Sequence, residues 1–137
     1  MTSRPTPARL AGQAAEAIRA LNHATRGDGL EYPADVYEVV ASLKLMEQRL
    51  PQLYGQLASF LAAENEAGRV AHDMGEPSGP YVTETIAALA DAKLSTAATA
   101  EALDAAHNAC AGLKRDADPQ FGDPGPSRDA VDREAAD

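Results

Sequence analysis

The chain has 137 residues, enough for one small domain, and 45% of them are hydrophobic while 24% are charged. Aromatic residues make up only 4% of the chain and tryptophan is absent, whereas alanine is abundant. Alanine favours helices, and the aromatic and β-branched residues that favour strands are sparse, so the composition predicts an all-α protein. The net charge of −9 argues against nucleic acid as the main partner, because phosphate binding needs clustered lysine and arginine.

Cellular location is constrained by three features of the sequence. Cys110 is the only cysteine, so an intramolecular disulfide is impossible. No apolar run reaches the roughly 18–20 residues of a membrane span, and the first residues lack the apolar core of a secretory signal. We therefore expect a cytoplasmic protein, with secretion by a route that needs no cleaved signal left open.

The first helix is predicted over residues 7–26, after a disordered N-terminus of residues 1–5. Thr6 is a suitable N-cap and Pro7 suits the first turn, where its missing N–H has no intrahelical partner. Gly27 is expected to end the helix. One face of this helix carries the apolar residues Leu10, Ala14, Ala17, Ile18 and Leu21.

The second helix is predicted over residues 33–67. Its large apolar residues recur in steps of three and four: Val36, Val39, Leu43, Met46, Leu50, Leu53, Leu57 and Phe60. This stripe passes Pro51 without a change of phase, which predicts one continuous helix that is kinked at Pro51. Pro51 directly follows a stripe residue and is expected to face solvent. Tyr37 lies off the stripe and is expected to be exposed, and Gly68 is expected to end the helix.

The third helix is predicted over residues 80–113, with Ser78 as a possible cap. The second and third helices are both about 34 residues long, or roughly 50 Å, which predicts an antiparallel hairpin. The shorter first helix is expected to pack along half of this hairpin and complete a three-helix bundle. Residues 114–137 are rich in Asp, Pro and Gly and are predicted to form a disordered acidic tail.

Candidate chemical groups are few. His107 and Cys110 are three residues apart on the third helix and therefore share a face, and the predicted topology brings His23 to the same end of the bundle. His and Cys side chains can bind zinc. Cys110 nevertheless has the size of a small core residue, so we favour a structural role and expect no metal site. His72 and Asp73 are interpreted as polar loop residues, and neither catalytic residues nor a cofactor are expected.

The run AEAIRALNHATRGDGLEYPADVYEVVASLKLMEQRLPQLYGQLASFL, residues 15–61, is similar to small alanine-rich helical proteins of actinomycetes that have no assigned function. The resemblance implies a helical fold. It implies no activity and assigns no site residue.

The main functional hypothesis is a non-catalytic helical interaction or adaptor protein that binds a protein partner, a second copy of itself, or both, with a dimer as the favoured arrangement. The short first helix leaves half of the hairpin uncovered, which predicts an apolar interaction patch formed by Leu53, Leu57, Phe60, Leu61, Val82, Ile86 and Leu89. One alternative is a small metal-binding protein that uses His107 and Cys110. The other is an accessory nucleic-acid factor that uses the arginines of the first helix, Arg4, Arg9, Arg19 and Arg26.

Overall fold

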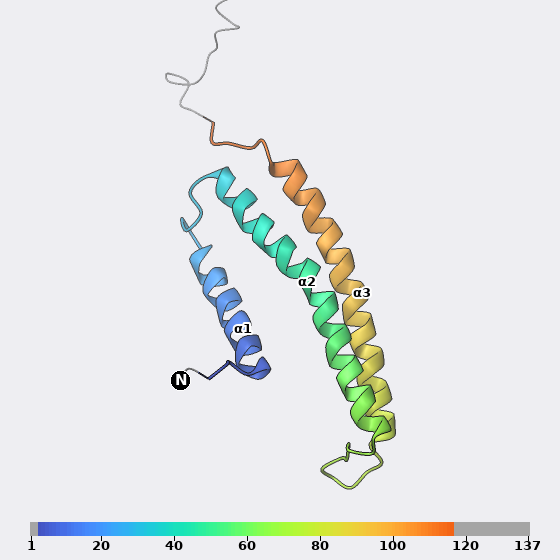
Figure 1. Ribbon diagram of the computed structural model, residues 1–137. Coiled ribbons are helices and arrows are strands. Elements are labelled where there is room, and N and C mark those ends of the chain that lie inside the picture. Colours follow the sequence, from blue (N-terminus) through green and yellow to red (C-terminus); the bar gives the residue numbers. More distant parts are fainter. Residues whose placement is uncertain (1–2, 117–137) are drawn as a thin grey trace, which may run out of the picture. The chain divides into compact units, whose positions relative to one another are not determined.

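A computed structural model describes residues 3–116 of the chain. These residues form three helices and no strand: α1 (Pro7–Ala24), α2 (Pro33–Glu66) and α3 (Gly79–Cys110) (Figure 1). The all-α class is therefore confirmed, and each helix begins and ends within three residues of its predicted bounds. The disorder predicted for residues 1–2 and 117–137 lies outside the described residues.

The chain divides into two compact units, which we describe separately. Of the described residues, the first contains 3–36 and 112–116, and the second spans Tyr37–Ala111. α1 belongs to the first unit, and nearly all of α2 and all of α3 belong to the second. The packing of α1 along the hairpin therefore stays a prediction.

Both ends of α1 follow from local chemistry. The Thr6 hydroxyl oxygen accepts a hydrogen bond from the backbone N–H of Arg9 at 3.1 Å, which confirms Thr6 as the N-cap. The turn after the helix contains Gly27 with a φ of 57°. It also contains Gly29, where a Cβ atom would lie 1.7 Å from the carbonyl oxygen of Ala24. The turn therefore excludes any side chain at position 29.

The first turn of α2 is stabilised by Asp35. Its Oδ2 accepts hydrogen bonds from the backbone N–H groups of Glu31, at 3.0 Å, and Tyr32, at 2.9 Å. Tyr32 immediately precedes the helix, so Asp35 fills the third helical position and binds back to the N-cap amide as in a capping box. The bonds from Tyr32 and Glu31 favour the ionised carboxylate and lower the pKa of Asp35 below its usual value.

Replacing Asp35 with asparagine is expected to lower the melting temperature at pH 7. The folded-state pKa of Asp35 is lowered, so its contribution is complete above the unfolded-state pKa of about 4 and is lost as the pH falls through the folded-state pKa. Thermal unfolding followed by circular dichroism between pH 7 and pH 2 measures this effect. A difference between wild type and Asp35→Asn that is as large at pH 2 as at pH 7 would show that the carboxylate charge is not responsible.

The second unit is an antiparallel hairpin of α2 and α3, which lie side by side along their length (Figure 1). α2 runs without interruption through Pro51, and its axis changes direction near the middle of the helix (Figure 1). The predicted continuous, kinked helix is therefore confirmed. A proline inside a helix removes one backbone hydrogen bond and crowds the preceding turn, which accounts for the bend.

The hairpin turn begins at a glycine C-cap. Gly68 has a φ of 73°, its N–H donates to the carbonyl of Asn65 at 3.1 Å, and the N–H of Arg69 donates to the carbonyl of Glu64 at 2.9 Å. This pair of bonds is a Schellman motif, so the predicted helix end at Gly68 is confirmed.

Ser78 does not cap α3 with its side chain. Its backbone already has helical angles, with φ −79° and ψ −24°, whereas a side-chain cap needs an extended residue. Its hydroxyl instead donates to the carbonyl of Val70 at 3.0 Å and ties the start of α3 to the preceding loop. Ser78 is therefore the N-cap residue at the predicted position, but the predicted side-chain capping bond is absent.

The α3 side of the hairpin interface is made of small side chains. Four residues of α3 are buried: Val82, Thr96, Ala100 and Cys110. The Thr96 hydroxyl donates to the carbonyl of Ala92 at 2.7 Å, so this buried polar group is satisfied within the helix. Because three of the four side chains are no larger than threonine, the two helices can approach each other closely.

The face of α2 that meets α3 does not coincide with the leucine stripe. Three α2 residues mark the face that contacts α3. The Tyr37 ring stacks on His107, Lys44 is ion-paired with Asp104, and a Cβ on Gly55 would lie 3.6 Å from Lys93 Nζ. Tyr37 is half-buried, so the prediction that it is exposed was wrong.

Only part of the leucine stripe lies on the other side of α2: Leu53, Leu57 and Phe60 are exposed, whereas Val39, Leu43, Met46 and Leu50 are half-buried. Leu57 follows Gly55 by two residues, which places it about 200° around the helix from the α3 contact. Pro51 comes two turns after Lys44 and is half-buried on the α3 side, so the prediction that it faces solvent was wrong.

Candidate functional site

The outer face of α2, on the side away from α3, carries a row of exposed apolar side chains. Leu53 is 44% exposed, Leu57 46% and Phe60 66%. Together with Arg49 and Glu64 they lie within an arc of about 80° on the helix surface. We call these five residues, Arg49, Leu53, Leu57, Phe60 and Glu64, the outer α2 face.

Charge is arranged unusually along this face. Residues 50–63 include no charged side chain, although 24% of the chain is charged. Arg49 and Glu64 stand at the two ends of this neutral run, fifteen positions apart or about 22 Å along the helix. The face therefore has an apolar centre with a cation at one end and an anion at the other.

The two terminal charges differ in their surroundings. Glu64 accepts two hydrogen bonds from Arg69, at 2.8 Å from Nε and 3.1 Å from Nη2. This ion pair raises the pKa of Arg69 and fixes the Glu64 carboxylate at the end of the helix. Arg49 makes no side-chain hydrogen bond or ion pair with any residue between 3 and 116. Its guanidinium is thus free to bind an external carboxylate.

A shallow depression lies at the Arg49 end of the outer α2 face. It is lined by Ser42, Leu45, Met46, Arg49, Leu50 and Leu53. All of these residues come from α2, so the depression is an open hollow between neighbouring side chains of one helix. Its floor is mostly aliphatic, which suits an apolar side chain of a partner better than a polar ligand.

The seven residues of the predicted interaction patch occupy two different surfaces. Leu53, Leu57 and Phe60 belong to the outer α2 face, and Leu61 is half-buried beside it. Val82 is only 5% exposed, and Ile86 and Leu89 follow it on the same face of α3 and are half-buried. The structure therefore places the α3 members of the patch within the hairpin interface rather than beside the exposed leucines.

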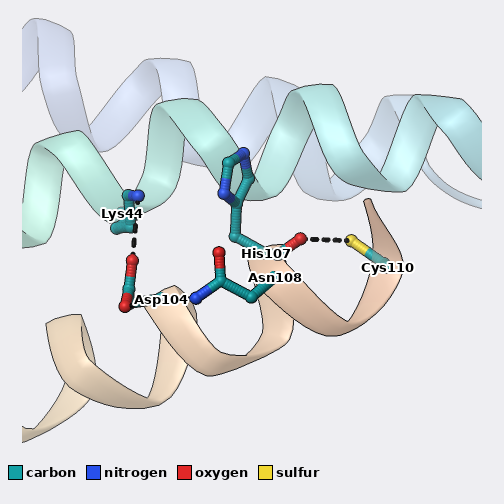
Figure 2. Close-up of polar contacts among 5 residues, drawn as sticks. All are labelled: Lys44, Asp104, His107, Asn108 and Cys110. Atoms are coloured by element: carbon teal, nitrogen blue, oxygen red, sulfur yellow. Dashed lines mark hydrogen bonds and ion pairs between the residues drawn. The ribbon is translucent and has the colours of Figure 1, made fainter. Parts of the chain in front are cut away.

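His107 and Cys110 both serve the packing of the hairpin. The His107 ring points toward α2 (Figure 2). It stacks on Tyr37, with 4.2 Å between the ring centroids and 21° between the planes. The Cys110 thiol is buried and donates to the carbonyl of His107 at 3.6 Å, so the sulfur and the ring do not converge on one point (Figure 2). His23 is in the last turn of α1.

Polar contacts are also present at the end of the hairpin that contains His107 and Cys110. Lys44 donates to Asp104 across the two helices at 3.1 Å, and the amide of Asn108 donates to the same carboxylate at 3.5 Å (Figure 2). Within residues 3–116, no three His, Cys, Asp or Glu side chains form a group that could hold a metal ion. The Lys44–Asp104 ion pair joins the two helices at this end, and the Asn108 bond supports the Asp104 carboxylate from within α3.

The loop between α2 and α3 is closed by side-chain contacts around His72. Its ring stacks on Tyr81 at 4.4 Å, and its Nδ1 accepts the backbone N–H of Met74 at 3.1 Å. The Tyr81 hydroxyl donates to Glu76, which raises the pKa of Tyr81. These contacts hold the long loop against the start of α3, and they explain His72 as a structural residue.

None of the helices in the described part of the chain has the length and hydropathy that a bilayer-spanning helix needs. Comparison with protein-family models, with curated proteins and with solved structures finds no match. Function must therefore be inferred from the geometry of the hairpin, and the outer α2 face is its most distinctive surface.

Proposed function

We propose that this is a non-catalytic helical interaction protein that self-associates through the outer α2 face. The observation that supports the proposal is the row formed by Leu53, Leu57 and Phe60, which is exposed in the centre of a helix segment without charged residues. Single exposed apolar residues are ordinary on protein surfaces. A contiguous row on one face of one helix is typical of a surface that a partner covers.

Self-association is favourable because leaving the row of Leu53, Leu57 and Phe60 in water costs free energy. Burying apolar surface contributes roughly 25 cal/mol per Å², and the three side chains keep about half or more of their surface exposed. Association of two apolar helix faces removes this surface from water. The net charge of −9 opposes the approach of two copies in general, but the outer α2 face is neutral because Arg49 balances Glu64. Two copies can therefore meet at this face with little repulsion.

The two alternative functions gain no comparable support. The metal hypothesis needs His107 and Cys110 to converge, whereas His107 stacks on Tyr37 and the Cys110 thiol donates to the backbone. The nucleic-acid hypothesis needs free arginines on α1, whereas Arg19 pairs with Glu16 at 3.1 Å. We therefore propose a single function.

Replacing Leu57 with lysine is expected to weaken self-association at least tenfold, because it places a charge at the centre of the apolar face. The average mass of the wild-type chain should rise from 14.3 kDa toward twice that value as concentration increases. Sedimentation velocity over a concentration series measures the average mass of the wild type and the weaker association of the Leu57→Lys variant. The helical content should not change, because Leu57 is 46% exposed and does not face α3.

Ser59→Lys is the matched control for this experiment. Ser59 is also exposed on α2 and lies about 160° around the helix from Leu57, outside the outer α2 face. The substitution adds the same charge and should leave self-association unchanged. A wild-type chain that stays a monomer at every concentration, or equal association of the two variants, would contradict the proposal.

A further inference from the structure

We infer that two copies of the chain pair through the outer α2 face with their α2 helices antiparallel, so that Arg49 of each copy meets Glu64 of the other. This inference rests on the proposed self-association and specifies its geometry. The two-fold axis would pass between residues 56 and 57, the midpoint of the neutral run.

The charges at the two ends of the face determine the orientation. In a parallel pair, Arg49 would lie beside Arg49 and Glu64 beside Glu64, which is repulsive at both ends. In an antiparallel pair the cation of one copy lies beside the anion of the other, and this happens twice by symmetry. Arg49 has no partner among residues 3–116, so it enters the intermolecular ion pair without losing a contact. Glu64 already accepts Arg69 of its own chain, and each of its carboxylate oxygens keeps a further lone pair for Arg49 of the other copy.

The shape of the face agrees with the same arrangement. A two-fold axis between residues 56 and 57 places Phe60 of one copy opposite Leu53 of the other, since the two positions are equally far from the axis. Phe60 is the most exposed large hydrophobic side chain of α2, and Leu53 borders the aliphatic depression that also contains Met46 and Leu50. The protruding ring of each copy therefore lies opposite the Leu53 edge of its partner's hollow.

Cysteine cross-linking tests the orientation directly. In a chain with Cys110→Ala, Leu53→Cys and Phe60→Cys are introduced separately and the two proteins carry tags of different mass. Positions 53 and 60 of the two copies would lie opposite each other at packed-helix distance, whereas position 53 of one copy would lie about 10 Å along the axis from position 53 of the other. A disulfide needs Cα atoms within about 7 Å.

The expected result is that neither single-cysteine protein cross-links with itself under mild oxidation, whereas their mixture gives the mixed 53–60 dimer. Cross-linking of each variant with itself would show a parallel pair and overturn the inference while leaving self-association intact. Dimers in sedimentation velocity without any cross-link would place the interface elsewhere and overturn it as well. A monomer in sedimentation velocity would contradict the proposed function itself.

Charge reversal provides an independent test that leaves the apolar residues in place. Arg49→Glu and Glu64→Arg should each weaken association at least about tenfold alone, and an equimolar mixture of the two should restore it. Arg9→Glu changes the net charge by the same amount on α1 and should have no effect. Association of Arg49→Glu equal to that of Arg9→Glu would overturn the reciprocal Arg49–Glu64 pairing.

Discussion

Ala100→Asp is expected to destabilise the hairpin by at least about 3 kcal/mol. Ala100 is 8% exposed and lies on the face of α3 that packs on α2. Aspartate at this position would bury a carboxylate with no cationic partner, and Asp104 one turn away would add repulsion. Urea unfolding followed by circular dichroism measures the loss.

Ala98→Asp serves as the control, because Ala98 is exposed in the interior of the same helix. Both substitutions carry the same intrinsic cost of aspartate in a helix, about 0.7 kcal/mol, so the difference between them isolates the effect of burial. Equal destabilisation by the two substitutions would mean that Ala100 does not face α2 in solution.

Val82→Ala is expected to cost about 2 kcal/mol, from the lost burial of two methyl groups and a small cavity. Val82 is 5% exposed, the lowest value among the apolar residues of the hairpin interface. Differential scanning calorimetry measures the stability, and Thr83→Ala at the exposed neighbouring position should change it little.

Val82→Ala also tests whether the α3 residues of the predicted interaction patch belong to the same surface as its α2 residues. Since Val82 lies between the helices, Val82→Ala should leave the dimer dissociation constant unchanged while it lowers stability. Leu57→Lys should weaken association and leave stability unchanged when stability is measured at a concentration at which both chains are monomeric. A Val82→Ala chain that is as stable as wild type but no longer self-associates would place Val82 in the dimer interface and contradict the separation of the patch into two surfaces.

The small interface within the hairpin also favours self-association on energetic grounds. Among the described residues, only Val82, Thr96, Ala100 and Cys110 are buried, and no side chain is less than 2% exposed. Such small side chains contribute little apolar area each. A partner that binds only the folded hairpin stabilises it further by mass action, so folding and association are expected to be coupled.

Sequence alone determined the secondary structure and its connections. Proline in the first turn at Pro7, Pro33 and Pro80, and glycine after α2 at Gly68, mark local backbone requirements that do not depend on the rest of the fold. The unbroken phase of apolar residues through Pro51 likewise showed that α2 is one helix. The comparable lengths of α2 and α3 then led to the antiparallel hairpin.

Only the tertiary structure decided which face of α2 meets α3. Periodicity shows which residues share a face, but an interface forms where the surfaces of both helices fit together. The Tyr37–His107 stack, the Lys44–Asp104 ion pair and the small α3 side chains match one another, and the part of the stripe from Leu53 to Phe60 is left exposed. The predicted interaction patch therefore combined exposed leucines of α2 with α3 residues that lie in the hairpin interface, because pairing between helices depends on complementary shape and charge that no single helix contains.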